Sequence, residues 1–530
     1  MNAQATAPDT GLNRALITVS IMLATIMQAV DTTIANVALP HMQGSMSATS
    51  EQIAWVLTSY IVAAAIMTPM TGFLSARFGR KRLFVVSVTG FTVTSLLCGV
   101  AVSLDQIVLF RLLQGVFGAG LVPLSQSVLL DTFPKEKHGS AMAIWGVGVM
   151  VGPILGPTLG GYLTEYYNWR WVFLINLPVG VLALAGILMF VPETERMRRR
   201  FDLFGFTLLS LAIGSLQLML DRGQSLDWFS SREIVIEGIV CAVCLYLFIA
   251  HMLTARDPFL EPGLFRDRNL VIGLVFIFIV GVVLLATLAL LPPFLQSLMG
   301  FPVITTGEVL APRGIGSMIA MLLVGRLVNR VDVRLLVGFG LTLTAVSLFE
   351  MSHFNLEIAP MALVRTGIVQ GLGLGFVFVP LSTITFSTLD HRYRTEGTAM
   401  FSLMRNIGSS IGISVMVAWA ARNTQINHAV LGEQLTPFRE PVRALLDMPA
   451  LGSDQTLAYL NQELTRQAAA ISYLNDFQAM AWMTLAARSA CLTPRAAAAT
   501  SSTTSCLERT PTCGEPAAAA AAPGLVVVAK

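Results

Sequence analysis

The sequence predicts an all-α protein that crosses a membrane many times. Of the 530 residues, 54% are hydrophobic and only 12% are charged, whereas soluble domains carry roughly 25% charged residues. Long apolar runs alternate with short charged segments, as in polytopic membrane proteins. The order of glycines, arginines and glutamines in the first part of the chain recurs in the second. The first two observations exclude a soluble globular protein, and the third predicts two related halves.

Fourteen apolar runs are candidate membrane spans. The first contains Asp31 and has no small-residue cleavage site after it, so we interpret it as a retained helix and not as a signal peptide. The runs cover residues 15–39, 53–74, 83–103, 106–130, 140–163, 171–191, 203–220, 233–253, 270–291, 305–325, 335–352, 359–384, 397–419 and 473–490.

Basic residues predict the orientation. With the N-terminus inside, the inner loops hold 18 Lys and Arg residues, and the short outer loops hold only Arg170, Arg222 and Arg232. The positive-inside rule therefore places both termini in the cytoplasm. The outer loop at 421–472 carries four Arg, but long loops escape that rule.

Two stretches of the chain share one order of features. In the first, Gly72 is followed by Arg77, Lys81, an intramembrane Arg111, Gln114-Gly115 and a glycine-rich helix from Gly148. In the second, Gly325 is followed at nearly equal spacing by Arg330, Arg334, an intramembrane Arg365, Gln370-Gly371 and a glycine-rich helix at Gly408–Gly412. Two homologous membrane halves are typical of many secondary transporters.

The repeat divides the chain into units. The predicted units are a cytoplasmic N-terminus (1–14), a six-helix half (15–191), an inserted two-helix hairpin (203–253), a second six-helix half (270–487) that includes the outer loop, and a low-complexity tail (488–530). The tail holds three of the six cysteines and two alanine runs, unlike the rest of the chain. Either it is a disordered cytoplasmic segment, or the reading frame changes near residue 487 and truncates the last helix.

A glycine stripe marks the fifth span. Glycines recur every fourth residue at Gly148, Gly152, Gly156 and Gly160, with Gly161 beside them and Pro153 and Pro157 in the same helix. On a helix this spacing makes a flat stripe that allows close approach of a neighbour, and the prolines each remove a backbone donor. The stripe is either a packing surface alone or part of a moving contact between helices.

A tight basic turn is predicted between the second and third spans. It comprises Gly72, Arg77, Gly79, Arg80 and Lys81. One interpretation is topology anchoring alone, and the other is a gate on the inner face.

Two of the ionisable residues predicted inside the membrane are candidate site residues. Arg111 lies near the start of the fourth span, where a guanidinium needs a partner, a watery cavity or a route to the headgroups. Asp31 lies in the outer half of the first span and shares a helical face with Gln28, Thr32, Ala35 and Asn36. A lone carboxylate at that depth is either structural or a site that binds a proton or a cation.

No catalytic or nucleotide-binding constellation is found in the sequence. Gly408-Ser-Ser-Ile-Gly412 matches a hydrolase elbow, but it lies inside a helical apolar run and not at a strand–turn–helix junction. There is no phosphate-binding loop of the Walker type. We therefore expect neither an enzyme nor a cofactor, a metal or an ATP-driven pump.

Together these residues resemble the fourteen-helix drug:proton antiporter branch of the major facilitator superfamily, the EmrB/QacA type. The glycine stripe is similar to the antiporter motif at the seam between the two halves, the Gly72–Lys81 turn to the inner-loop gating motif, and the Arg111 run to the helix-four motif with its proton-handling Arg. One departure is Ala76, where the family often has Asp. Further matches are Asn168–Trp171, Ile175–Pro178, Ala311–Gly314, Arg405–Gly408 and the outer segment that begins at Asn461.

The resemblance implies export of amphipathic drugs, often cationic, across the bacterial cytoplasmic membrane in exchange for protons. Asp31 and Arg111 would couple protons, and Gln28, Thr32 and Asn36 would line the substrate cavity. Such pumps often work with a periplasmic adaptor and an outer-membrane channel, and nothing suggests a nucleic-acid partner. The alternatives are a proton-coupled importer on the same fold and a non-transporting membrane sensor. The sequence names neither the substrate nor its charge.

Overall fold

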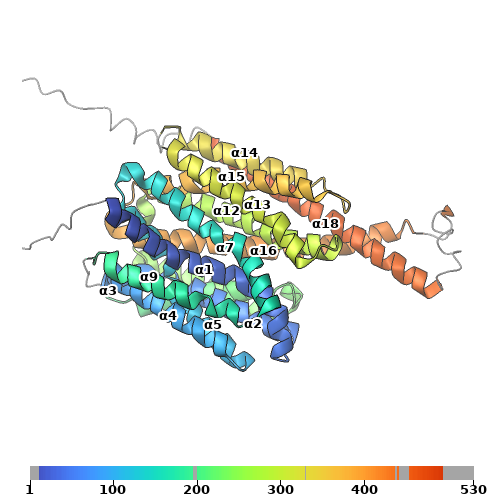
Figure 1. Ribbon diagram of the computed structural model, residues 1–530, viewed down its shortest axis with the longest axis horizontal. Helices are drawn as coiled ribbons and strands as arrows, with labels where there is room; N and C mark the ends of the chain where they lie inside the picture. Colours follow the sequence, from blue (N-terminus) through green and yellow to red (C-terminus); the bar gives the residue numbers. More distant parts are fainter. Residues whose placement is uncertain (1–10, 195–199, 329, 436–438, 441–452, 493–530) are drawn as a thin grey trace, which may run out of the picture.

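A computed structural model describes residues 11–194, 200–328, 330–435, 439–440 and 453–492. The described residues form helices and no β-strand. The helices lie side by side, roughly along the long axis of the molecule (Figure 1).

Eleven α-helices lie in the described part of the chain before residue 255. They are α1 (Gly11–Ser45), α2 (Ser50–Met67), α3 (Met70–Phe78), α4 (Arg80–Val100), α5 (Leu104–Gly118), α6 (Leu121–Thr132), α7 (His138–Tyr166), α8 (Trp171–Leu174), α9 (Asn176–Phe190), α10 (Leu203–Arg222) and α11 (Arg232–Thr254). The later helices are α12 (Arg268–Pro293), α13 (Val303–Leu327), α14 (Val333–Met351), α15 (Pro360–Ser387), α16 (Arg394–Gly432) and α18 (Ser453–Leu492).

Several helices begin where the sequence offers a cap. Thr49 and Gln52 form a reciprocal capping box before α2, and the Ser103 hydroxyl accepts from the Gln106 amide before α5. Asp267 accepts from two amides at the start of α12. These side chains satisfy backbone donors that the first helical turn leaves open, which explains why the chain turns at these positions.

Twelve helices among the described residues are long and apolar enough to cross a membrane, or thirteen if the pair α2 and α3, bent by 57°, counts as one span. The helix α18, which contains the predicted span 473–490, does not meet the same test. The many apolar helices confirm a polytopic membrane protein, whereas the count of fourteen spans stays a prediction.

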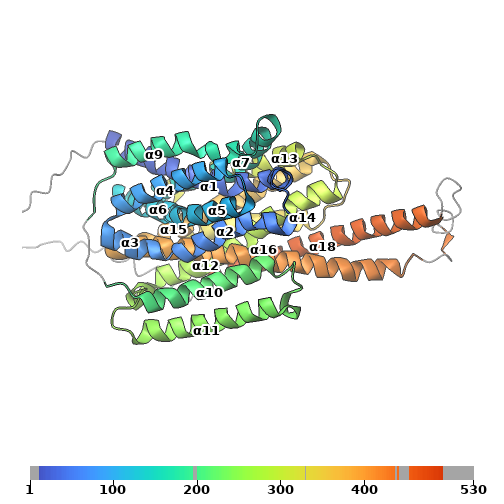
Figure 2. The ribbon, with the colours of Figure 1, turned by 90° about the horizontal axis from the view of Figure 1, so that it is seen from below.

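The two halves have matching internal contacts. In the first, α1 packs against α7 and α9, α2 against α5, and α4 against α5 and α9. In the second, α12 packs against α16 and α18, α13 against α15, and α14 against α15 and α18. The helices α10 and α11 form a hairpin, and α10 contacts both α2 and α16 (Figure 2). The inserted hairpin therefore lies beside both halves.

Two long helices project from one end of the molecule. α16 continues past the predicted end of its span at 419 to Gly432, and α18 begins at Ser453, well before 473. The Asn427 amide donates to the Ser472 hydroxyl over 3.1 Å, which ties the two helices together. Much of the predicted outer loop is therefore helical, and it reaches beyond the other helices (Figure 2).

The structure describes only the first few residues after 487, where the sequence analysis placed a possible change of reading frame. α18 continues through residue 487 to Leu492. The remainder of the unusual tail, 493–530, lies outside the described residues, so the hypothesis stays a prediction.

Candidate functional site

A buried polar network lies inside the first half, and Asp31 of α1 is its centre. Arg111 Nη1 of α5 donates to Asp31 Oδ2 over 2.7 Å. Gln114 Nε2, one turn along α5, donates to Asp31 Oδ1 over 3.1 Å, and Asn176 Nδ2 of α9 donates to the same oxygen over 2.8 Å. The two predicted intramembrane charges are therefore partners, although 80 residues separate them in the sequence.

The network is closed off from its surroundings. The side chain of Arg111 is 1% exposed and that of Asp31 is 0% exposed. The Arg111 guanidinium also donates to the carbonyl of Val56 over 3.2 Å and lies 4.4 Å from the ring centroid of Tyr60. Both residues belong to α2, so four helices (α1, α2, α5 and α9) meet at one ion pair.

This geometry makes the Asp31 carboxylate the common acceptor of three donors. A buried pair of opposite charges is retained only when further hydrogen bonds satisfy both groups, and here Gln114 bridges them by also accepting from Arg111 over 2.8 Å. A proton on Asp31 would remove the negative charge and leave Arg111 without its counter-ion. A change of charge at Asp31 would therefore affect contacts among four helices.

The predicted polar stripe of α1 is divided between two environments. Asp31 and Ala35 are buried inside the first half, whereas Thr32 and Asn36 are exposed and Gln28 is half-buried. Thr32 and Asn36 thus lie on the open side of the helix that carries Asp31. Their predicted part in a substrate cavity stays a prediction, since neither residue lines the cavity between α12, α13, α14 and α15.

The glycine stripe of α7 faces α1. A methyl group at Gly152 would collide with the backbone of Ala29, and one at Gly156 would collide with Thr33, whose hydroxyl donates to the Gly152 carbonyl over 3.0 Å. By contrast, a methyl group at Gly161 would meet nothing within 4 Å. The stripe is therefore a contact within the first half, which corrects the expectation that these glycines form the seam between the halves.

Other residues of α7 do lie at that seam. The Ser140 hydroxyl donates to the carbonyl of Gly325 on α13 over 3.0 Å. Trp145 stacks on Phe378 of α15 with ring centroids 5.9 Å apart. α7 therefore connects α1, which carries Asp31, to the second half. The helix also continues through Pro153 and Pro157.

The predicted basic turn lies at a second contact between the halves. Arg80 pairs with Asp131 at the end of α6, and Asp131 also accepts from Arg394 Nη1 of α16 over 2.5 Å. His391, just before α16, lies 2.9 Å from the same carboxylate. One carboxylate of the first half thus faces three basic side chains, two of which belong to the second half. The carboxylate comes from Asp131 of α6, since position 76 on α3 is an alanine.

The other residues of the turn have separate roles. Gly79 has a φ of 90°, which favours glycine. A Cβ at Gly72 would lie 2.5 Å from Cγ of Glu396 on α16, so glycine permits the halves to touch. Arg77 lies over Phe73 and Phe78, with 6.0 and 5.8 Å to the ring centroids. Lys81, the last residue of the turn, is half-buried.

The expectation that Arg365 is the counterpart of Arg111 in the second half is wrong. Its side chain is 71% exposed and lies 3.7 Å from Glu350 near one end of α15. By contrast, Arg313 on α13 of the second half is buried, at 5% exposure. The sequence analysis named Arg313 only as part of the family-like segment Ala311–Gly314 and gave it no role.

The sequence analysis also missed three residues that contact the predicted site residues. Asn176 opens α9 and Tyr60 lies in α2, and neither was assigned to the Asp31 site. Asp131, an acidic residue at the end of an apolar run, could have been noticed as a candidate for the basic turn. The described residues contain no group of three or more His, Cys, Asp or Glu side chains that could hold a metal.

Comparison with known proteins decides the family. The model of the Major Facilitator Superfamily matches residues 21–413. This chain belongs to the major facilitator superfamily. Among curated relatives of this transporter family, it is similar to the multidrug export protein EmrB of Escherichia coli K12, with 37% identity over 471 residues that cover 88% of this chain and 92% of the relative.

Two further comparisons agree with that assignment. The chain is 36% identical over 465 residues to the fatty acid resistance protein FarB of Neisseria gonorrhoeae, covering 87% of this chain and 92% of the relative. Among solved structures it resembles the human organic anion transporter MFSD10 (TETRAN), with a TM-score of 0.59 at 14% identity, covering 89% of this chain and 99% of that one. The last likeness concerns the fold alone. The two bacterial relatives are named as an export protein and a resistance protein, and the many apolar helices agree with a multi-pass membrane protein.

Proposed function

We propose that this chain is a proton-driven exporter of amphipathic small molecules. It moves them out across the cytoplasmic membrane while protons move in, and both of its termini are cytoplasmic. The observation that carries the proposal is the ion pair of Asp31 and Arg111, which is buried, joined by Gln114 and Asn176, and placed among four helices. It supplies one protonatable group whose charge state affects helix packing.

The protonation step has a direct structural consequence. When a proton from the outer side binds the Asp31 carboxylate, Arg111 loses its counter-ion and must find other acceptors, since a guanidinium does not release its own proton. The buried charge then favours a rearrangement in which Arg111 is solvated or re-paired. When Asp31 releases the proton to the cytoplasm, the ion pair forms again and the cycle is complete.

Packing supplies a route from this site to the seam. The α1 segment around Asp31 lies against the glycines of α7, so that a shift of α1 also moves α7. The opposite face of α7 contacts α13 and α15. We infer that α7 transmits the protonation state to the contact between the halves.

The cluster at Asp131 is the proposed inner gate. Its carboxylate joins Arg80 of the first half to Arg394 and His391 of the second. Opening the cytoplasmic side requires these pairs to separate. Drug molecules would enter between the halves, where Thr32 and Asn36 are available on α1. A periplasmic adaptor and an outer-membrane channel are the proposed partners, and the α16–α18 projection is the segment that would reach toward them.

The test is drug-dependent proton movement in inside-out vesicles. The wild-type chain in energised vesicles should release protons when a transported dye is added, and the Asp31→Asn variant should not. Asp105→Asn is the matched control, because Asp105 is an exposed carboxylate on α5, the helix of Arg111. Equal proton release from wild type and Asp31→Asn at matched expression would contradict the proposal.

The same assay separates the alternatives. A proton-coupled importer would move dye in the same direction as protons, so dye would leave the vesicles together with them. A non-transporting sensor would show neither dye movement nor proton release. Export driven by exchange predicts dye entry into the vesicle as protons leave.

A further inference from the structure

A second buried carboxyl group lies in α18, the last helix of the second half. Asp476 is 0% exposed, and neither of its oxygens has a hydrogen-bond partner among the described residues. Its neighbour Phe477 and Tyr473, one turn earlier, both contact the ring of Phe294, with ring centroids 6.4 and 5.8 Å apart. Aromatic rings therefore enclose the part of α18 that carries this carboxyl group.

No charged side chain of the described residues offsets a charge on Asp476. On α18 itself, Tyr473 interacts electrostatically with Asp476. The other elements packed against α18 are α12, α14, α16 and the π-helix Phe294–Leu298. Their ionisable side chains are Arg268 on α12, Arg334 and Glu350 on α14, and Arg394, Glu396, Arg405, Arg422 and His428 on α16. Glu350 and Arg394 are paired with other residues.

The surroundings of Asp476 and Asp31 are opposite. Asp31 accepts hydrogen bonds from three donors, one of which is the Arg111 guanidinium, so this carboxylate has a counter-ion. A carboxylate at Asp476 would be a buried charge with neither a donor nor a counter-ion, and a group in that position becomes neutral by binding a proton. Physical chemistry therefore favours a proton on Asp476 and a negative charge on Asp31.

The two halves carry a polar residue at the same point of their last predicted span. Asn176 lies near the start of the sixth span, three residues after an aromatic side chain, and Asp476 lies near the start of the last span, also three residues after one. Both are buried, at 2% and 0% exposure. In the first half this residue supports the ion pair, because Asn176 Nδ2 donates to Asp31 over 2.8 Å. In the second half this residue is itself a carboxyl group.

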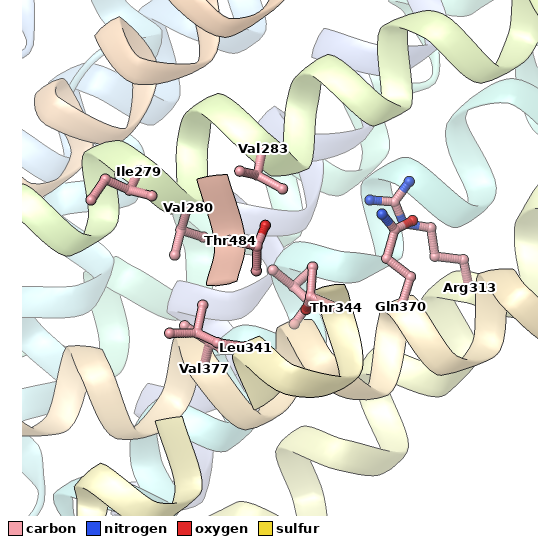
Figure 3. A pocket seen from close by; sticks show the side chains of 10 residues that line it. Ile279, Val280, Val283, Arg313, Leu341, Thr344, Gln370, Val377 and Thr484 are labelled. Atoms are coloured by element: carbon pink, nitrogen blue, oxygen red, sulfur yellow. The ribbon is translucent and has the colours of Figure 1, made fainter. Parts of the chain in front are cut away.

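The buried face of α18 connects Asp476 to the interior of the second half. Met480 and Thr484 follow at intervals of four residues, which places them on the same helical face, and they are 0% and 2% exposed. Thr484 lines a cavity with Thr344 and Gln370 (Figure 3), and the free room in it is about 30 Å³, enough for a water molecule. Eight residues of helix place this cavity about 12 Å from Asp476.

The predicted outer side lies close to Asp476 in the other direction. Its neighbour Asn475 is exposed. Ser472, one turn earlier, is tied to Asn427 within the projecting parts of α18 and α16 (Figure 2). Asp476 therefore lies at the base of the projection, between the outer side and the water-sized cavity.

We propose that Asp476 is a second proton-binding group of the transport cycle and is protonated in this conformation. It takes a proton from outer water, which forms one O–H bond on the carboxylate, and releases that proton toward the cytoplasm when the helices rearrange. This inference rests on the proposed exchange of drug for protons and adds to it, since each cycle then moves one proton through Asp31 and one through Asp476.

Infrared difference spectroscopy of the full-length protein tests the proton on Asp476. At neutral pH, the spectrum of wild type minus that of Asp476→Asn should contain the carbonyl stretching band of a protonated carboxyl group, which moves to lower frequency in heavy water. Asp31→Asn should retain this band, and so should Asp105→Asn, the control that removes an exposed carboxylate of α5. Carboxylate bands in place of the carbonyl band would overturn the proposal.

The ratio of protons to dye in inside-out vesicles tests the part of Asp476 in transport. Asp476→Asn should release about half as many protons per dye molecule as wild type. Asp31→Asn should release none, and Asp105→Asn should match wild type. A wild-type ratio in Asp476→Asn at matched expression would overturn the proposal even where the carbonyl band is present.

Failure of the proposed exchange gives a different result from failure of this inference. Absence of proton release from wild type refutes the exchange and, with it, the coupling through Asp476. Proton release from wild type with an unchanged ratio in Asp476→Asn refutes the role of Asp476 alone. If Asp476→Asn fails to fold, Asp476→Val, which replaces the carboxyl group by an apolar one, takes its place in both assays.

Discussion

Removal of either member of the Asp31–Arg111 pair should have unequal effects on stability. Asp31→Asn leaves the Arg111 guanidinium buried at 1% exposure without a counter-ion, and arginine cannot become neutral. The asparagine side chain also presents an NH2 group where two oxygens accepted three hydrogen bonds. Breaking a buried pair in this way costs about 3–5 kcal/mol.

Arg111→Met should cost less. The remaining Asp31 can bind a proton, become neutral and still accept from Gln114 and Asn176. The losses are the Arg111 hydrogen bonds and its contact with the Tyr60 ring, for which we expect about 1–3 kcal/mol. The double variant, which has no buried charge at this site, should be more stable than Asp31→Asn alone.

Thermal unfolding of the purified variants in detergent provides the measurement. The expected order of midpoints is wild type, then Arg111→Met, then Asp31→Asn, with the double variant above Asp31→Asn. Asp105→Asn, an exposed carboxylate on α5, controls for a general effect of charge removal. If Asp31→Asn unfolds no earlier than Arg111→Met, the reasoning that Arg111 depends on Asp31 for its charge balance is wrong.

Three other variants test the packing, the gate and an isolated carboxyl. Gly152→Ala should lower the midpoint of thermal unfolding, because its Cβ meets the Ala29 backbone and overpacking costs roughly 1–3 kcal/mol. Gly161→Ala is the control and should leave the midpoint unchanged. Equal midpoints for the two variants would contradict the close contact at Gly152. Asp131→Asn removes the carboxylate that three basic side chains share. It should therefore increase thiol labelling of cysteines introduced on the cytoplasmic side of the seam. Unchanged labelling would mean that other contacts hold the halves together. Asp476→Asn should leave the midpoint equal or higher, because neither carboxylate oxygen of this buried residue has a hydrogen-bond partner among the described residues; a large decrease would reveal a partner that matters.

The sequence determined the class of the protein and both residues of its buried ion pair. Apolar runs of membrane length can bury their backbone polar groups only as helices, so composition and run length were sufficient to predict an all-helical membrane fold. Asp31 and Arg111 were identifiable one at a time, because a charged side chain within an apolar run is costly and needs a reason. The repeated Gln-Gly pair also predicted that two halves with the same arrangement exist.

Only the tertiary structure decided which residues are partners. Periodicity along one helix shows that residues share a face, but it does not show which neighbouring helix meets that face. For this reason the sequence analysis grouped Asp31 with Thr32, although Asp31 is buried and Thr32 is exposed. The glycine stripe predicted close packing correctly, yet its partner is α1 and not the other half. Arg365 matched Arg111 by spacing, but its side chain is exposed, whereas Arg313 on a different helix is buried. Spacing in the sequence determines how far along its helix a side chain lies. Only the packing of neighbouring helices determines which surroundings the side chain faces and which residue is its partner.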